Sequence, residues 1–454
     1  MTESNSLAQK LDCLWMPFTD MQAFARDPLV LQKAEGPYVY DIDGNEYLDC
    51  ISSLWHVGVG HGNRHYLDRI KAQLDGALTS ASLFGSAHMA ALDLASRLVA
   101  FVDDARLRKV FFSSGGSEAV ETALKVAIQY NKIRGRGGDK VVYLKRAYHG
   151  VTLGALSAMG IEGDRMGFEA HLSREFIAAE SPHCYRCPYG LSRPRCELAC
   201  AKSLERLIAQ HPGEITTLIV EPVQGAGGII VPPPDYLREL HRICREHDIV
   251  FILDEVVTGY WRTGARFAFQ AEGVAPDILV LSKGMSGGVL PLGATVVSRE
   301  IFDTFTAADE VFMHGNTYGG NPLSCAAGIA HLEFVSRPEF AARVHALVGE
   351  FAAGLEALKH HDLVGDIRQK GLMAGIELVT DRVTKEPYKP QRPLALLARR
   401  HGLLLRPLGN VITLFPMMTV TPSALVDMFV RLDAFLHDLG RMSKRGGPRL
   451  AAGG

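Results

Sequence analysis

Short apolar runs alternate with amphipathic stretches between about residues 60 and 330. Five of these runs are rich in β-branched and aromatic residues and are bounded by polar or turn residues, at 109–112, 140–144, 217–220, 249–253 and 278–281. Continuous apolar runs of this length predict parallel strands that are buried on both faces of a sheet. Residues 117–132 and 236–247 repeat apolar positions at helical spacing and predict helices that cover the sheet. The pattern is typical of an α/β fold with crossover helices.

The two ends of the chain follow a different pattern. Residues 38–45 predict a short hairpin that turns at an Asp-Gly or Gly-Asn pair. A long helical pattern runs from about residue 335 to 360, and residues 367–378 and 411–414 predict strands. The tail at 442–454, rich in glycine and basic residues, predicts a frayed end.

These patterns predict a division into two domains. Residues 61–330 are expected to form a large domain that binds the ligand. Residues 1–60 and 331–454 are expected to form one small α+β domain, built from both ends of the chain. A chain of 454 residues is long enough for this arrangement and for a large core.

Composition narrows the class of protein. The chain is 47% hydrophobic and 22% charged, which is typical of a soluble globular protein. The formal net charge is −2 and no long block of one sign occurs, so we expect small-molecule partners and neither nucleic acid nor a membrane. The N-terminus shows no secretory signal pattern and no stretch is long and apolar enough to span a bilayer, so we expect a cytoplasmic protein.

Three polar sites follow predicted strands, at the edge where open α/β sheets bind ligands. Residues 113–118 contain two glycines and lead into a predicted helix. This pattern is compatible with a phosphate-binding site and also with a simple strand-to-helix turn. Asp254 follows the fourth run and Lys283 follows the fifth, and alone they could form a buried ion pair. Together the three sites match the needs of pyridoxal phosphate, which requires an anion site, an acid at its ring nitrogen and a lysine at its aldehyde.

The sequence resembles the class III aminotransferases, which are fold-type I enzymes dependent on pyridoxal phosphate. Six ordered motifs carry the resemblance, at 111–119, 147–152, 220–228, 253–264, 277–284 and 314–323. It covers about residues 12–435. It implies a mostly parallel seven-stranded sheet sandwiched by helices, a small α+β domain, and a homodimer with shared active sites that could pair again into a dimer of dimers.

The resemblance also implies roles for individual residues. Lys283 would bind pyridoxal 5'-phosphate covalently and, once released, carry the proton between the substrate Cα and the cofactor. Asp254 would keep the pyridine nitrogen protonated. Gly116 and Ser117 would bind the phosphate, and Thr317 of the neighbouring subunit would reach the same phosphate.

A second set of residues would surround the cofactor ring. Tyr148 would stack on one face and Val256 would pack on the other, although a tyrosine or valine taken alone is more often simple core packing. Gln224 would approach the ring hydroxyl, and His149 lies in the same cofactor-binding motif as Tyr148. Glu221 resembles an acid that, in relatives handling both ω-amines and 2-oxo acids, pairs with an active-site arginine.

The resemblance also implies three residues that contact the substrate. Phe18 and Trp55 lie in segments that resemble substrate-facing segments of the biotin-pathway aminotransferases, and Arg406 resembles an arginine that binds the substrate carboxylate. Phe18 stands where many of those enzymes have tyrosine, whereas Val151 after Tyr-His-Gly is more typical of ω-amine:pyruvate transaminases. Trp261 replaces a usual glycine and is expected to add bulk near the rim of the pocket.

The resemblance therefore predicts a transaminase that moves an amino group between an ω-amine or amino acid and a 2-oxo acid, pyruvate or 2-oxoglutarate, with ping-pong kinetics. One alternative is the adenosylmethionine- or lysine-dependent 8-amino-7-oxononanoate aminotransferase of biotin synthesis. Another is an aminomutase or epimerase on the same scaffold. A dinucleotide-binding oxidoreductase is disfavoured because no Gly-x-Gly-x-x-Gly follows the first strand. The sequence leaves the natural donor, the acceptor and the stereochemistry open.

Four of the eight cysteines lie close together in sequence, at positions 184, 187, 196 and 200. This spacing is compatible with a structural zinc site, with disulfides, or with free thiols in a reducing compartment. We assign it no part in catalysis and expect no metal in the active site.

Overall fold

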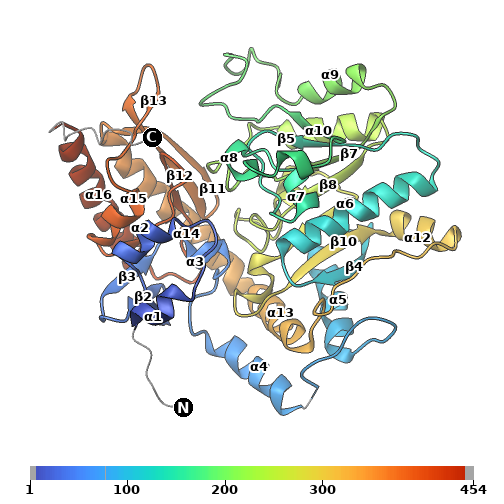
Figure 1. Ribbon diagram of the computed structural model, residues 1–454, viewed down its shortest axis with the longest axis horizontal. Helices are drawn as coiled ribbons and strands as arrows, with labels where there is room; N and C mark the ends of the chain where they lie inside the picture. The colour runs from blue at the N-terminus through green and yellow to red at the C-terminus, as the bar shows by residue number, and fades with distance from the viewer. Residues whose placement is uncertain (1–6, 77, 445–454) are drawn as a thin grey trace.

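A computed structural model describes residues 7–76 and 78–444 (Figure 1). A seven-stranded sheet forms its centre, with strands in the order β4-β10-β9-β8-β7-β5-β6. Only β10 runs antiparallel to its neighbours β4 and β9, while β9, β8, β7, β5 and β6 pair in parallel. The strands are β4 (Leu107–Ser113), β5 (Lys140–Leu144), β6 (Phe176–Ala179), β7 (Ile215–Val220), β8 (Val250–Asp254), β9 (Ile278–Leu281) and β10 (Gly293–Ser298). The predicted fold class is confirmed.

Helices cover both faces of this sheet, as the continuous apolar strands require. Ile252 in β8 packs in the cluster that includes α6, whereas its neighbour Leu253 packs in the cluster that includes α5 and α10. The helices of this part are α5 (Met89–Val102), α6 (Gly116–Ile133), α7 (Leu153–Ser157), α8 (Glu162–Arg165), η1 (Glu169–His171), α9 (Ser203–Gln210), α10 (Tyr236–Glu246), α11 (Ala268–Glu272), η2 (Lys283–Ser286), α12 (Arg299–Ala307) and α13 (Pro322–Val335).

Two smaller sheets bring the chain ends together. One has the order β1-β2-β3-β14, in which Leu403 of β14 lies opposite Leu48 of β3 in a parallel pair. The other joins β11, β12, β13 and β15. The strands are β1 (Leu31–Glu35), β2 (Tyr38–Asp41), β3 (Glu46–Asp49), β11 (Val364–Lys370), β12 (Met373–Asp381), β13 (Glu386–Pro387), β14 (Leu403–Leu404) and β15 (Val411–Leu414). The predicted hairpin at 38–45 is the β2-β3 turn.

Helices surround these smaller sheets on the left of Figure 1. They are α1 (Leu7–Asp12), α2 (Met21–Arg26), α3 (Ser52–Trp55), α14 (Pro338–Ala357), η3 (Leu358–His360), α15 (Leu394–Arg399) and α16 (Pro422–Lys444). Helix α4 (Arg64–Asp75) lies at the bottom of Figure 1 and packs against α13. The boundary expected at residue 330 falls inside α13, whose His331 Nδ1 lies 3.0 Å from the hydroxyl of Tyr66 in α4. The division into domains stays a prediction.

Two sequence expectations about the C-terminal part were wrong. The single strand expected at 367–378 is a hairpin of β11 and β12. Gly371 makes its turn with φ +59°, and a Cβ there would lie 2.3 Å from the carbonyl carbon of Thr263, so the turn requires glycine. Residues 442–444, expected to be frayed, are the last residues of α16, and residues 445–454 lie outside the described part.

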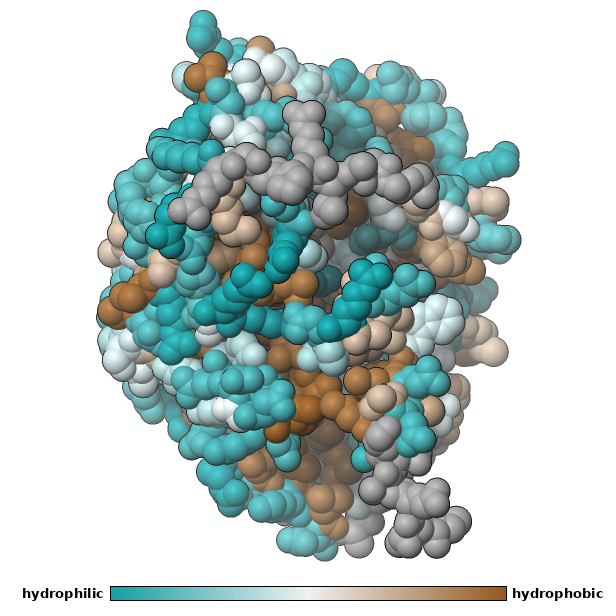
Figure 2. Space-filling view, turned by 60° about the vertical axis from the view of Figure 1, so that its left-hand side comes forward, coloured by the Kyte–Doolittle hydropathy of each residue, from teal (hydrophilic) through white to brown (hydrophobic). Residues whose placement is uncertain are grey.

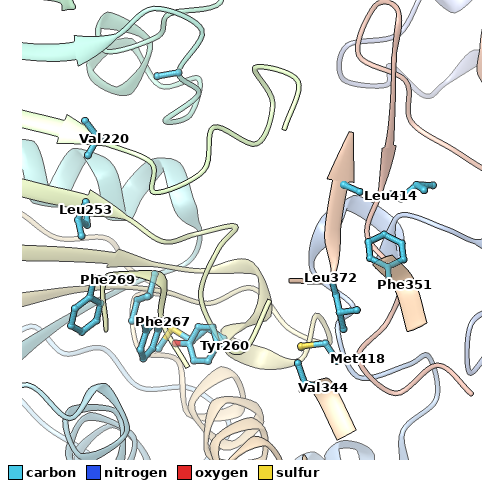
Figure 3. Packing of buried hydrophobic residues seen from close by; sticks show 14 of the residues in the cluster. Val220, Leu253, Tyr260, Phe267, Phe269, Val344, Phe351, Leu372, Leu414 and Met418 are labelled. Atoms are coloured by element: carbon cyan, nitrogen blue, oxygen red, sulfur yellow. The ribbon is translucent and has the colours of Figure 1, made fainter. Parts of the chain in front are cut away.

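One continuous apolar core links the large sheet to the smaller ones. Figure 3 shows Val220 and Leu253 on neighbouring strands of the large sheet and Leu414 on β15, all members of this core. Figure 2 shows polar side chains over most of one face, with apolar side chains gathered below its middle. None of the helices within residues 7–76 and 78–444 is both long and apolar enough to cross a membrane.

Glu255 follows Asp254 but supports the fold. Its fully buried carboxylate accepts hydrogen bonds from the Thr258 hydroxyl (3.0 Å) and from the backbone N–H groups of Ala268 and Phe269 (both 2.8 Å). The Glu255→Ala variant leaves these donors unpaired, so we expect the free energy of unfolding to fall by about 3–5 kcal/mol. Urea unfolding of the protein measures the change.

The matched control is Glu246→Ala, which removes an exposed carboxylate from an ion pair with Arg242. We expect this control to cost at most about 1 kcal/mol. Equal unfolding midpoints for the two variants would contradict a structural role for Glu255.

Candidate active site

The polar residues that follow the strands meet at the carboxyl edge of the large sheet. Strands β8 and β9 are parallel neighbours, and Asp254 lies opposite Val280. Asp254 therefore ends β8 next to the point where β9 leads into Lys283, the first residue of η2. Helix α6 begins at the same edge, after β4. The structure therefore brings Asp254, Lys283 and the start of α6 together at one edge of the sheet.

Lys283 reaches a cavity of about 890 Å³. Burial lowers the pKa of its ammonium group, the Arg406 charge lowers it further, and the Asp254 and Glu221 carboxylates oppose both effects. Its Nζ lies 5.9 Å from the centre of the Trp55 ring. A buried lysine with a lowered pKa supplies a neutral amine that can attack a carbonyl carbon or accept a proton.

Asp254 is held in place by two contacts. Its Oδ1 accepts a hydrogen bond from the Val256 backbone N–H (3.0 Å), and its Oδ2 lies 2.8 Å from Nδ1 of His149. The Nε2 atom of His149 is buried and has no partner within the described part of the chain. A buried polar atom without a partner is costly, so this position suits a polar ligand.

The start of α6 suits an anion. Its N-cap, Gly115, provides no side-chain cap, so the first N–H groups of the helix remain available to a ligand. A Cβ on Gly116 would lie 3.3 Å from a methyl carbon of Val256, so the glycine allows close packing next to Asp254. The Ser117 hydroxyl accepts a hydrogen bond from the Val151 N–H (3.2 Å), in the loop that follows Tyr148.

Five predicted residues line the cavity, namely Phe18, Trp55, Tyr148, Lys283 and Arg406. The Trp55 ring stacks on Phe415 with centroids 4.7 Å apart, and the Arg406 guanidinium carbon lies 5.5 Å from the Trp55 centroid. Within residues 7–76 and 78–444, no side chain forms an ion pair with Arg406. An unpaired guanidinium at a cavity suits a carboxylate ligand.

Glu221 is fully buried, and its placement differs from the expectation of an arginine partner. Its two oxygens accept hydrogen bonds from the backbone N–H groups of Tyr148 (3.0 Å) and Gly225 (2.9 Å). Burial raises its pKa to about 7. None of the arginines in the described part of the chain pairs with it, so Glu221 here fixes the segment that carries Tyr148.

Gln224 is also buried and already bonded. Its Oε1 accepts from the Ser181 hydroxyl (2.6 Å), and its Nε2 donates to the Lys145 carbonyl oxygen (2.9 Å). These bonds tie the segments that follow β5, β6 and β7 to one another. An approach to the ring hydroxyl stays a prediction.

Nine predicted residues are not part of the cavity lining, namely Gly116, Ser117, His149, Glu221, Gln224, Asp254, Val256, Thr317 and Trp261. Thr317 is exposed in the turn before α13, and its role in the phosphate site of a neighbouring subunit stays a prediction. Trp261 was expected near the rim, but its indole N–H donates to the Val335 carbonyl oxygen (3.0 Å) and its ring lines a separate cavity. Its backbone φ of +71° turns the side chain toward the end of α13.

The structure adds residues to the cavity that the sequence analysis did not select. Arg146 lines it directly before the Tyr148 motif, and Asp164 lines it from helix α8. Burial raises the pKa of Asp164, and the Arg406 charge lowers it. Adjacency to the Tyr148 motif could have indicated Arg146, whereas no local pattern marks Asp164.

The four clustered cysteines line one cavity of about 230 Å³ and are free thiols. Burial raises the pKa of the Cys184 thiol, and it raises that of Cys200 to about 11. Within the described residues, one group of side chains could share a metal ion, and it does not include these cysteines.

Comparison with known proteins agrees with this geometry. Residues 21–436 match the aminotransferase class-III family. The chain is 40% identical to the adenosylmethionine-8-amino-7-oxononanoate aminotransferase of Nitratidesulfovibrio vulgaris, over 91% of this chain and 78% of that protein.

Two solved structures are also similar to the whole chain. The (S)-enantioselective ω-transaminase of Thermomicrobium roseum is 35% identical, with a TM-score of 0.91 over 95% of this chain and 98% of its own. An amine transaminase from an uncultivated Pseudomonas species, solved with pyridoxal phosphate bound, is 39% identical, with a TM-score of 0.88 over 94% and 99% of the two chains. The chain therefore belongs to the class III aminotransferases, enzymes that depend on pyridoxal phosphate.

Proposed function

We propose that this enzyme transfers an amino group from an ω-amine or amino acid to a 2-oxo acid, pyruvate or 2-oxoglutarate, by a ping-pong mechanism. The observation that carries the proposal is the presence of two groups in one cavity: the buried amine of Lys283 and the unpaired guanidinium of Arg406. The first can move a proton at carbon, and the second can bind a carboxylate. Amino acids and 2-oxo acids both carry that carboxylate.

The proposed division of work among the residues follows from their positions. Pyridoxal phosphate, when bound, supplies an electron sink for the substrate carbanion. The N-terminus of α6 with Gly116 and Ser117 binds the phosphate, and Asp254, fixed by His149, holds a proton at the ring nitrogen. Lys283, whose pKa is lowered by burial, removes and returns the proton at the substrate Cα.

A second candidate is the transfer of an amino group from adenosylmethionine or lysine to 8-amino-7-oxononanoate. The observation that favours it is the name of several relatives, including the protein of Geobacter sulfurreducens that is 39% identical over 93% of this chain. Phe18 and Trp55, which line the cavity, are the residues that would contact this larger acceptor.

Half-reactions separate the two candidates. The holoenzyme is mixed with single donors in the absence of any acceptor, and loss of the cofactor's visible absorption is recorded. The first proposal expects bleaching by an ω-amine or L-alanine and recovery with pyruvate or 2-oxoglutarate. Bleaching by adenosylmethionine or lysine only, with recovery only by 8-amino-7-oxononanoate, would establish the second candidate instead.

Arg406 provides a separate test of carboxylate binding. We expect Arg406→Ala to raise the KM of the 2-oxo acid by about 10–100-fold, because charge-assisted hydrogen bonds to the carboxylate are lost. The KM of an amine without a carboxylate should stay unchanged. Steady-state kinetics with both substrates varied measures the difference. Arg400→Ala, which removes an exposed arginine of the same segment, is the control. An equal rise for both substrates would contradict the assignment.

We also propose a homodimer in which Thr317 of one subunit completes the phosphate site of the other. The support is a set of exposed apolar side chains in the segments around this residue: Phe84, Met89, Leu92, Met313 and Tyr318. Apolar surface of this kind is typical of subunit contacts. Light scattering of the holoenzyme tests the dimer, and Thr317→Ala should weaken phosphate binding.

A further inference from the structure

Three histidines and one aspartate converge in the small-sheet part of the molecule, away from the residues that line the Lys283 cavity. His360 ends η3 and His361 follows it, before β11 begins. Asp433 and His437 lie one turn apart on α16, the last helix. One ligand atom from each of the four side chains lies within 4.8 Å of every other. The mechanism proposed above uses none of these residues.

The Asp433 carboxylate is the centre of the group. Its Oδ1 lies 2.8 Å from Nε2 of His361 and 3.7 Å from Nε2 of His360, and its Oδ2 lies 3.8 Å from Nε2 of His437. Four tetrahedral ligands at zinc distances are about 3.3 Å apart. Small side-chain rotations are therefore enough to place all four ligand atoms around one ion.

The surroundings orient these ligands. Nδ1 of His360 lies 2.7 Å from the Ala357 carbonyl oxygen, which can only accept, so Nδ1 carries the hydrogen and the Nε2 lone pair faces the group. The Arg382 guanidinium donates to the carbonyl oxygens of Lys359 (2.9 Å) and His361 (2.6 Å), which fixes the turn between η3 and β11. The histidine side chains thus project from a restrained backbone.

His361 is buried, whereas His360 and His437 are exposed and open to an ion from solvent. Three imidazoles and one carboxylate are donors typical of zinc and of nickel, copper and cobalt, whereas magnesium and calcium prefer oxygen ligands.

We propose that His360, His361, Asp433 and His437 form a binding site for one divalent transition-metal ion of the zinc class. The ion takes the place of the hydrogen between His361 Nε2 and Asp433; in the neutral ring that hydrogen moves to Nδ1, so that Nε2 offers its lone pair to the ion. It links the end of η3 to α16 and thereby fastens the last helix to the rest of the small-sheet part. The site stabilises the fold and is independent of the amino-transfer reaction proposed above.

Metal binding to the full-length holoenzyme tests the proposal. Protein treated with chelator and dialysed is titrated with Zn²⁺, and separately with Co²⁺, whose visible absorption reports tetrahedral coordination. We expect one equivalent bound at this site and a rise in the thermal midpoint on binding. His360→Ala and His437→Ala remove exposed side chains, so the fold should survive, and each should weaken binding by at least about tenfold.

Two control variants test whether the ion binds at this group of side chains. His171→Ala removes an exposed histidine outside the group and should bind as the unchanged protein does. A Cys184→Ser/Cys187→Ser variant should also retain the ion and the Co²⁺ spectrum. The proposal is overturned if the unchanged protein retains no zinc, if His437→Ala and His360→Ala bind as tightly as the unchanged protein, or if only the cysteine variant loses the ion.

Discussion

Lys283→Ala is expected to lower the rate of amino transfer by at least about 10⁴-fold, since in the proposed mechanism it removes both the covalent attachment of the cofactor and the base that acts at the substrate Cα. The amine is buried in the active-site cavity, and burial keeps its pKa low. The other lysine of the cavity lining, Lys145, forms an ion pair with Glu180 that raises its pKa, so it does not supply a second neutral amine. Single-turnover kinetics with a bleaching donor measures the loss.

Three further measurements separate this role from a general loss of folding. Borohydride reduction followed by peptide mass analysis should find the cofactor on Lys283 in the unchanged protein and on no lysine in the variant. Added methylamine should restore part of the proton-transfer rate in the variant. Lys132→Ala, which removes an exposed lysine of α6, should react normally. Full activity of the Lys283 variant would contradict the assignment.

The fold was predictable where local pattern and burial agree. The five apolar runs became β4, β5, β7, β8 and β9 because a strand buried on both faces has few alternatives. Strands β6 and β10 were not predicted. β14, only two residues long, exists because β3 lies beside it, more than three hundred residues earlier in the chain. The hairpin at Gly371 depends on contact with Thr263, which no local pattern encodes.

The residues of the candidate site were likewise predictable only where the local sequence pattern determines their position. Lys283 and Asp254 were identifiable because each follows a buried strand and their sheet positions bring them to one edge. The partners of Glu221 and Gln224 were not identifiable from the sequence. A backbone N–H group bonds to Glu221 and the Ser181 hydroxyl bonds to Gln224, and these groups come close only in the folded chain. The position of the Trp261 ring was also not predictable from the sequence, because its left-handed backbone conformation directs the ring away from the cavity.

Asp254→Asn is expected to lower kcat by at least about 100-fold while changing KM little, because the negative charge that stabilises the protonated ring nitrogen is lost but the shape of the side chain is kept. The Asp254 side chain is 4% exposed and is fixed by His149 and Val256, so water cannot substitute for it. Steady-state kinetics on holoenzyme of verified cofactor content measures the change.

The pH dependence of the same variant carries an independent signature. The Asp254 charge raises the pKa of Lys283 against the lowering effect of burial, so its removal should lower that pKa further. The limb of the rate profile that reports the neutral lysine should therefore move to lower pH, which loss of folding alone would not cause. Glu255→Gln, which alters the adjacent carboxyl group bonded to α11, should leave this limb in place. An unshifted limb in Asp254→Asn, together with an unchanged kcat, would show that Asp254 is a structural acid and that another group holds the proton at the ring nitrogen.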